Sequence, residues 1–119
     1  MSIQSVSSEK KVFSLGEAAS LMPLVQKITH NTVERVNELT NQLGNYTETD
    51  PEFEEIGCTI DALVKNWVEQ VRKLGCDVKG LWLVDFDNGH GYYCWAYPED
   101  NLDHFHGYEE GFRGRIRIC

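Results

Sequence analysis

The chain has 119 residues, 41% of them hydrophobic, a size and composition that predict one domain with a modest core. Its formal net charge is −8, so its overall field repels nucleic-acid backbones and anionic membrane surfaces, and we expect neither as a partner. The first residues lack the apolar segment of a secretory signal, and no apolar run reaches the roughly 18 to 20 residues of a membrane-spanning helix. We therefore expect a cytoplasmic protein whose residues 1–12 form a disordered or extended N-terminus.

The cysteines are far apart in the sequence and form no Cys-x-x-Cys pair. They are Cys58, Cys76, Cys94 and Cys119. This spacing argues against a zinc knuckle and against a disulfide framework. We expect reduced thiols, and we interpret Cys94, which lies among aromatic residues, as a packed thiol rather than a nucleophile.

A helix start signal opens the ordered part of the chain. Ser14 and Glu17 have the spacing of a capping box, and Phe13 directly before them is placed to act as a hydrophobic staple. Apolar residues then recur with helical spacing up to Leu43. Pro23 interrupts this pattern, so we expect either a kink or a separate first turn there.

A second helical stripe begins after a loop and closes at Gly75. Asp50, Pro51 and Glu52 combine a cap residue, a first-turn proline and a first-turn acid, which is typical of a helix start. Two amphipathic helices joined by a short loop predict an antiparallel helical hairpin over residues 14–75. Additional apolar residues widen both stripes, and this surplus either covers the sheet or forms a homodimer through the hairpin.

The hydrophobic period changes from helical to alternating in the last third of the chain. Strands are predicted at residues 81–86, 92–97, 102–106 and 115–118, separated by turn signals. The expected fold is therefore α+β, a single domain over residues 13–119. In it, the N-terminal helical hairpin packs on a small C-terminal antiparallel β-meander formed by residues 78–118.

The lengths of two turns determine which side chains share a face of this sheet. With Asn88-Gly89 as a two-residue loop, Trp82 lies opposite Trp95 and Val84 lies opposite Tyr93. With residues 98–101 as a four-residue loop, His104 lies opposite Trp95 and His106 opposite Tyr93. Both histidines would then share a face with these aromatic residues, although a slip of one residue would move them to the other face.

Short motifs in both halves occur in a recognisable order. The helical half opens with residues 13–19 followed by Leu21-Met22-Pro23, and the tail contains Leu83-Val84-Asp85-Phe86, Cys94-Trp95, Phe105-His106, Gly111-Phe112 and Gly114-Arg115. These motifs resemble a bacterial family catalogued as domain of unknown function 2203, over nearly the whole chain. The resemblance implies a fold and a site in the tail, without an established activity. The chain departs from the family at His104, where a tyrosine or similar residue is usual, and at Asp87, where the family has proline.

Two histidines in the tail suggest a metal site. His104 and His106 are two residues apart, so both imidazoles project from the same face of a strand. Glu110 is close enough in sequence to add a carboxylate, and the three residues together are candidate ligands for a divalent transition metal. The alternative is that the histidines only stack on tyrosines and tryptophans of a half-exposed sheet face.

Asp85 interrupts an otherwise apolar strand, so it requires either a partner or a raised pKa. Arg115 is the expected partner and His106 the second choice. The structural interpretation is an Asp85–Arg115 ion pair that joins the C-terminal strand to the first strand. The three arginines of the tail alternate in sequence, so on a strand they would share one face, suited to a small anion or to pairing with nearby acids. They are Arg113, Arg115 and Arg117.

These features favour a small binding module for a metal ion or a small polar ligand in the tail. The predicted ligand-binding residues are Asp85, Trp95, His106, Glu109 and Arg115. A first alternative is a metal-dependent or acid–base enzyme in which His106 and Asp85 carry protons. A second alternative is a homo-oligomeric assembly protein whose tail motif is only structural. The residues leave open whether any reaction is catalysed.

Overall fold

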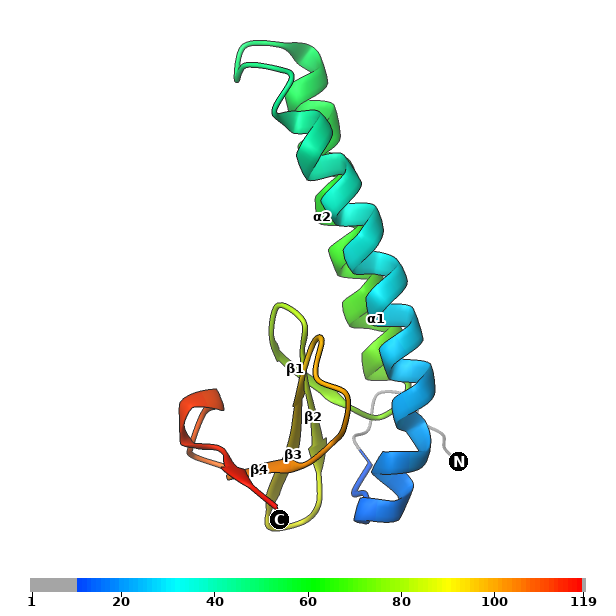
Figure 1. Ribbon diagram of the computed structural model, residues 1–119, viewed down its shortest axis with the longest axis vertical. Coiled ribbons are helices and arrows are strands. Elements are labelled where there is room, and N and C mark those ends of the chain that lie inside the picture. Colours follow the sequence, from blue (N-terminus) through cyan, green and yellow to red (C-terminus); the bar gives the residue numbers. More distant parts are fainter. Residues whose placement is uncertain (1–10, 119) are drawn as a thin grey trace, which may run out of the picture.

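A computed structural model describes residues 11–118, and the N-terminus expected over residues 1–12 lies mostly outside them. Two packed helices are followed by a five-stranded antiparallel sheet, which confirms the predicted α+β fold of a helical hairpin and a C-terminal meander (Figure 1). The strands follow one another in the sheet in the order β1-β2-β3-β4-β5. The elements are α1 (Leu15–Leu43), α2 (Pro51–Lys73), β1 (Asp77–Gly80), β2 (Leu83–Asp87), β3 (Gly91–Ala96), β4 (His104–Gly107), the short 3₁₀ helix η2 (Phe112–Gly114) and β5 (Ile116–Arg117).

The predicted capping box starts α1 and connects it to the sheet. Ser14 Oγ accepts a hydrogen bond from the backbone N–H of Glu17 at 3.1 Å, and Glu17 Oε1 accepts one from the backbone N–H of Ser14 at 2.9 Å. Phe13 is buried and packs edge-on against Phe86 of β2, with ring centroids 5.4 Å apart. The N–H of Phe13 also donates to the carbonyl of Asp87, so the start of α1 is held at the end of β2.

The C-terminal ends of α1 and α2 differ in backbone conformation, although a glycine follows each helix. A glycine directly after a helix often adopts the left-handed conformation, but Gly44 after α1 has φ −63°. The helix instead finishes in a tightened turn of consecutive i to i+3 hydrogen bonds. After α2, by contrast, Gly75 has φ +96°, the left-handed conformation that glycine favours. Within α1, Pro23 does not end the helix, so no separate first turn forms.

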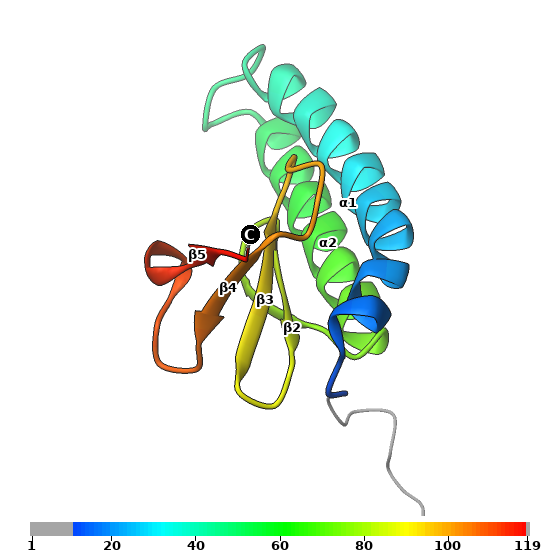
Figure 2. The same ribbon diagram turned by 60° about the horizontal axis from the view of Figure 1, so that its bottom comes forward.

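The lower part of the hairpin covers one face of the sheet and forms the core (Figure 2). Buried side chains of both layers meet there: Met22, Val25, Trp67 and Val71 from the helices, and Val84, Phe86 and Trp95 from the sheet. Inside this core, Trp67 Nε1 donates to Thr29 Oγ1 at 2.8 Å, a buried hydrogen bond between α2 and α1. The hydrogen bond satisfies the indole N–H and fixes how the two helices sit side by side.

The other end of the hairpin projects beyond the sheet (Figure 1). Apolar residues of α2 in that region, such as Phe53, Ile56 and Ile60, are only half-buried. The predicted homodimer through the hairpin stays a prediction. Neither helix in the described part of the chain combines the length and apolar character that crossing a membrane requires.

The sequence did not predict β1 as a strand. Residues 81–86 were predicted as one strand, whereas Leu81 and Trp82 form the tight turn between β1 and β2. Trp82 adopts the left-handed conformation with φ +62°, which is unfavourable for a large side chain. Its ring packs edge-on against the buried Trp67, with centroids 4.9 Å apart.

The register between β2 and β3 differs from the prediction by two residues. Val84 lies opposite Trp95 and Phe86 opposite Tyr93, because residues 88–91 form a four-residue turn. Asn88 Oδ1 stabilises that turn by accepting hydrogen bonds from the N–H groups of His90 and Gly91. A shift of two residues keeps each side chain on its predicted face.

The register between β3 and β4 differs by one residue, so the predicted face of both histidines is wrong. His106 lies opposite Tyr92 and His104 opposite Cys94. The connection between these strands spans residues 97–103 and is longer than the predicted four residues. Both imidazoles therefore point to the face away from the helices, whereas Trp95 belongs to the core.

We predict that Thr29→Val lowers the free energy of unfolding by about 1–3 kcal/mol, because it leaves the Trp67 N–H buried without an acceptor. Urea denaturation measures the change. The matched control is Thr32→Val in the same helix, whose hydroxyl bonds only to the carbonyl of Ile28 and which we expect to change stability by less than about 0.5 kcal/mol. Equal effects of the two substitutions would contradict a special role for the Thr29–Trp67 contact.

Candidate functional site

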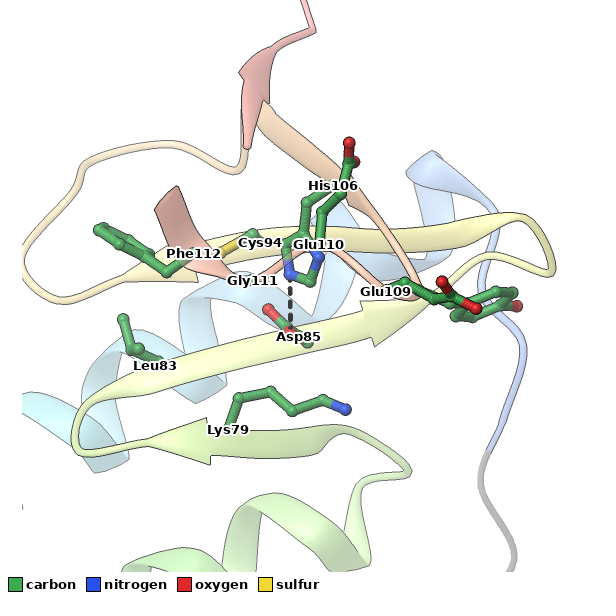
Figure 3. A pocket seen from close by; sticks show the side chains of 10 residues that line it. Lys79, Leu83, Asp85, Cys94, His106, Glu109, Glu110, Gly111 and Phe112 are labelled. Atoms are coloured by element: carbon green, nitrogen blue, oxygen red, sulfur yellow. Dashed lines mark hydrogen bonds and ion pairs between the residues drawn. The ribbon is translucent and has the colours of Figure 1, made fainter. Parts of the chain in front are cut away.

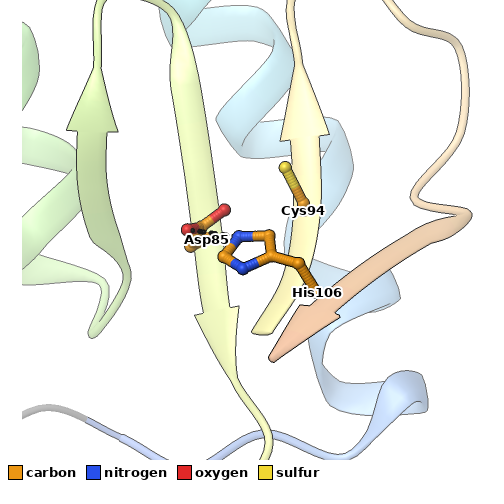
Figure 4. A group of neighbouring side chains, drawn as sticks. All are labelled: Asp85, Cys94 and His106. Carbon is orange, nitrogen blue, oxygen red and sulfur yellow. Dashed lines mark hydrogen bonds and ion pairs between the residues drawn. The ribbon is translucent and has the colours of Figure 1, made fainter. Parts of the chain in front are cut away.

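Three potential metal ligands from three neighbouring strands meet on the face of the sheet opposite the helices (Figure 4). They are Asp85 of β2, Cys94 of β3 and His106 of β4. Their donor atoms all lie within 4.8 Å of one another, and the residues are 1%, 1% and 4% exposed. Within residues 11–118, this is the one group of three or more such side chains that meets in this way.

The pairing of the strands explains the convergence. Asp85 and Cys94 are direct cross-strand partners, so their side chains project side by side from the same face. His106 is the partner of Tyr92, which lies two residues before Cys94 on that face. The imidazole therefore reaches the acid and the thiol diagonally.

The three side chains form the floor of a pocket of about 260 Å³ (Figure 3). Lys79 of β1 and Leu83 of β2 line it from the sheet, and residues 108–112, after β4, line it from the other side. The ring of Phe112 and the side chain of Leu83 lie toward one end, near Cys94. The hydroxyl of Tyr108 donates to Asp87 Oδ1 at 2.6 Å, which anchors the start of the segment beside the pocket.

The hydrogen bonds of His106 determine its protonation pattern. Nδ1 lies 2.9 Å from the carbonyl oxygen of Gly107, and because a carbonyl can only accept, Nδ1 carries a proton. Nε2 lies 3.0 Å from Asp85 Oδ2, so this second contact holds a single proton between the imidazole and the carboxylate. Either the pair is ionic, or a protonated Asp85 donates to neutral His106.

Burial controls the electrostatics of the site. It raises the pKa of the Asp85 carboxyl above its ordinary value, and the neighbouring His106 opposes this shift. Burial, reinforced by the negative charge of Asp85, raises the pKa of the Cys94 thiol to about 12. Without a cation, Cys94 is therefore a protonated thiol at neutral pH.

Arg115 is not the partner of Asp85, which corrects the first choice made from the sequence. Its guanidinium donates to both carboxylate oxygens of Glu99, with Nη1 3.0 Å from Oε1. His106, the second choice, fills the position next to Asp85. Arg115 still borders the cluster, because its Nη1 lies 4.0 Å from Cys94 Sγ.

The other predicted site residues lie around the cluster rather than in it. His104 Nδ1 is 3.0 Å from Asp103 Oδ1 but is not aligned for a hydrogen bond, and Glu110 Oε1 accepts from the N–H of Gly107. Of the predicted metal ligands His104, His106 and Glu110, only His106 belongs to the three-residue group, and the trio stays a prediction.

The predicted ligand-binding residues are similarly divided. Glu109 lines the pocket together with Asp85 and His106. Trp95 is buried in the core on the helix side, where its Nε1 donates to the carbonyl of Glu99. Arg115 approaches Cys94 of the pocket, with Nη1 4.0 Å from Sγ. The exposed Arg117 pairs with Asp103, with Nη2 3.2 Å from Oδ2.

Cys94 is the site residue that reasoning from the sequence missed. A cysteine between aromatic residues is usually a packing residue, and no motif spacing connects it to Asp85 or His106. A signal was nevertheless present, because the correct turn length after Asp87 places Cys94 directly opposite Asp85. The chemistry of the pair depends on a register that the turn sequence leaves ambiguous.

We predict that the native, metal-free protein resists alkylation at Cys94 at pH 8, because a thiol with a pKa of about 12 has almost no thiolate at that pH. Cys58 is exposed and should react readily with iodoacetamide, whereas Cys76, also buried with a pKa of about 12, should resist. Peptide mass spectrometry after timed labelling measures each site. Labelling of Cys94 as fast as Cys58 would show that the site is open to solvent.

Comparison with known proteins places the chain in a family. The family model described as "Uncharacterized conserved protein (DUF2203)" matches residues 11–118. No curated protein and no solved structure shows significant similarity to the chain. The match includes both helices, all five strands and the three residues of the cluster. The chain therefore belongs to the DUF2203 family of uncharacterized conserved proteins.

Proposed function

We propose that the protein binds one divalent transition-metal ion through Asp85, Cys94 and His106. The observation that carries the proposal is the close approach, in a buried position, of an oxygen, a sulfur and a nitrogen donor at the floor of a pocket. Buried groups of this kind need a compensating partner, and a shared cation is one that satisfies all three at once.

The separations between the donors support this proposal. Metal–ligand bonds of about 2.0–2.3 Å in a tetrahedral arrangement require donors roughly 3.3–3.8 Å apart. Asp85 Oδ2 and His106 Nε2 are 3.0 Å apart, and no separation within the group exceeds 4.8 Å. Small side-chain rotations would thus bring the three atoms to bonding distance without a change of backbone.

The orientation of His106 also fits a metal ligand. Its Nδ1–H donates to the carbonyl of Gly107, which leaves Nε2 directed toward Asp85. Ligating histidines in proteins usually donate their other ring N–H to a carbonyl or carboxylate in this way, which fixes the ring and raises its basicity.

The donor set favours a particular class of metal. Thiolate and imidazole ligands select zinc, cobalt, nickel, iron or copper, whereas magnesium and calcium prefer oxygen ligands. Three protein ligands leave at least one coordination position for water or a small polar molecule. In this protein, that position would face the pocket bordered by Lys79, Leu83 and residues 108–112.

Charge balance is consistent with the same ion. A divalent cation bound by the Asp85 carboxylate, the Cys94 thiolate and neutral His106 has a net charge of zero. Forming a neutral group lowers the cost of burying these charges on the sheet face. The cation would replace the thiol proton and the proton that Asp85 shares with His106.

An acid–base enzyme that uses His106 and Asp85 is the second candidate. It is favoured by the hydrogen bond between Nε2 and Oδ2 at the floor of the pocket, where a bound molecule could exchange a proton with the pair. This candidate gives Cys94 no chemical role. The two candidates therefore differ in what they predict for substitution of Cys94.

We predict that the protein, purified without a histidine tag, retains about one equivalent of zinc or takes up one equivalent of added Co²⁺. Cys94→Ala and His106→Ala should each weaken binding by about 100-fold, because each removes one of three ligands. Native mass spectrometry reports the stoichiometry, and competition with a chromophoric chelator reports the affinity.

Two matched substitutions serve as controls for metal binding. Cys76→Ala removes a second buried cysteine, and His90→Ala removes an exposed histidine of the β2–β3 turn, and neither residue belongs to the group. Both should bind metal like the wild type. If Cys94→Ala binds metal with wild-type affinity, the proposed ligand set is wrong.

We also predict that metal binding at pH 7.5 releases about two protons, one from Cys94 and one from the Asp85–His106 contact. The raised pKa values of Cys94 and Asp85 mean that protons compete more strongly with the metal as the pH falls, so affinity should decrease toward acidic pH. Titration calorimetry in buffers with different ionisation enthalpies counts the protons. Binding without proton release would exclude a thiolate ligand at this site.

A further inference from the structure

Arg115 connects the cluster to a segment of the chain that contributes no ligand to it. The residue lies between η2 and β5, near the C-terminal end of the described chain. Its guanidinium stacks over the ring of Phe112, 4.1 Å from the ring centroid, and donates twice to Glu99. The same group approaches Cys94, with Nη1 4.0 Å from Sγ.

These contacts leave the guanidinium little freedom. The side chain of Arg115 is 15% exposed, and that of Glu99 is 26% exposed. Glu99 is itself fixed, since its Oε1 accepts from the N–H of Ala96 at 2.9 Å. Glu99 thus holds both terminal nitrogens of the planar group while Nη1 also approaches the sulfur, a combination that a lysine ammonium cannot reproduce.

We infer that Arg115 is a positioning residue of the metal site: it donates a hydrogen bond to the Cys94 sulfur when that sulfur is a ligand, and so links metal occupancy to the fold of residues 111–118. This inference rests on the proposed metal binding at Asp85, Cys94 and His106. It assigns to Arg115 a role that the metal ligands themselves do not have.

Metal occupancy is linked to residues 111–118 because metal binding changes the charge of the Cys94 sulfur that Arg115 approaches. A thiol is a weak acceptor, whereas a metal-bound thiolate carries negative charge and accepts a shorter and stronger hydrogen bond from a cationic donor. Outer-shell hydrogen bonds of this kind typically change metal affinity by about 10- to 100-fold. Because linkage is reciprocal, the bound metal must stabilise the Arg115 contact by the same factor.

The C-terminal segment is attached by the backbone pairing of β5 with β4, by the N–H of Ile118 donating to the carbonyl of Asp103, and by two arginine side chains. β5 has only two residues, both exposed, and Ile116 is 64% exposed. The ion pair between Arg117 and Asp103 involves an arginine side chain that is 71% exposed, so it contributes little. The half-buried Arg115–Glu99 pair also approaches Cys94, so through it a change at the Cys94 sulfur can reach the segment.

The test compares Co²⁺ binding to the full-length wild type with binding to Arg115→Gln, Arg115→Lys and Glu99→Gln. The matched control is Arg117→Gln, which removes an arginine of the same segment without a contact to Cys94. We expect Arg115→Gln and Arg115→Lys to weaken Co²⁺ binding by about 10- to 100-fold and to shift the sulfur-to-cobalt charge-transfer band. Glu99→Gln, which keeps the cation but loosens its orientation, should have a smaller effect, and Arg117→Gln should have none.

Hydrogen exchange of the amides of residues 111–118 provides the second measurement. In the wild type, Co²⁺ should slow this exchange, and in Arg115→Gln the protection should disappear even when cobalt is saturating. Arg115→Lys and Glu99→Gln retain charge or size, so they keep the test valid if Arg115→Gln does not fold.

The outcomes separate the two proposals. If the wild type binds Co²⁺ through Cys94 and the variants at Arg115 and Glu99 bind it equally well with an unchanged charge-transfer band, the role of Arg115 is overturned and the metal site stands. If the wild type shows no sulfur-to-cobalt band and no binding, both proposals fall. Weaker binding in the Arg115 variants, together with lost protection of residues 111–118, supports the inference.

Discussion

The buried contact between Asp85 and His106 is the interaction on which the rest of the candidate site depends. A carboxyl group buried on the sheet face opposite the helices is unfavourable unless a neighbour offers charge or a hydrogen bond, and the imidazole of His106 forms that hydrogen bond. The contact also fixes the orientation of the ring, because the opposite nitrogen is held by the carbonyl of Gly107. Cys94 then completes a group with three different donor atoms.

The two faces of the sheet differ in composition and in what covers them. The face toward the helices is apolar and carries the core, in which Phe86 and Trp95 pack against Trp67 and its neighbours. The opposite face has neither α1 nor α2 over it and is covered by residues 108–112, so polar groups can be buried there beside a pocket. Because successive side chains of β2 and β3 point to opposite faces, this strand pair contributes both to the core and to the pocket.

Residues 108–115 border the candidate site: the first five of them line its pocket, and Arg115 approaches Cys94. Tyr108 anchors the start of this segment to Asp87, and Arg115 anchors its end to Glu99 beside Cys94. Between these two points the segment closes one side of the pocket. An ion on the sheet face would therefore act on chain elements from both sides of the pocket, whereas the helical hairpin serves mainly as the support against which the sheet is held.

Local sequence patterns were sufficient for the helices, their capping box and the α+β class, because these features depend on spacing within a few residues. The partners within the site were not determined locally. One additional residue in a turn reverses the face of every side chain that follows, so the position of His106 beside Asp85 and Cys94 depended on the true lengths of two connections. Arg115 pairs with Glu99 rather than with Asp85 for a similar reason. The folded connection after Ala96 brings the Glu99 carboxylate within reach of the guanidinium. The sequence by itself thus determined which residue types were present in the tail, and the tertiary structure decided which of them meet.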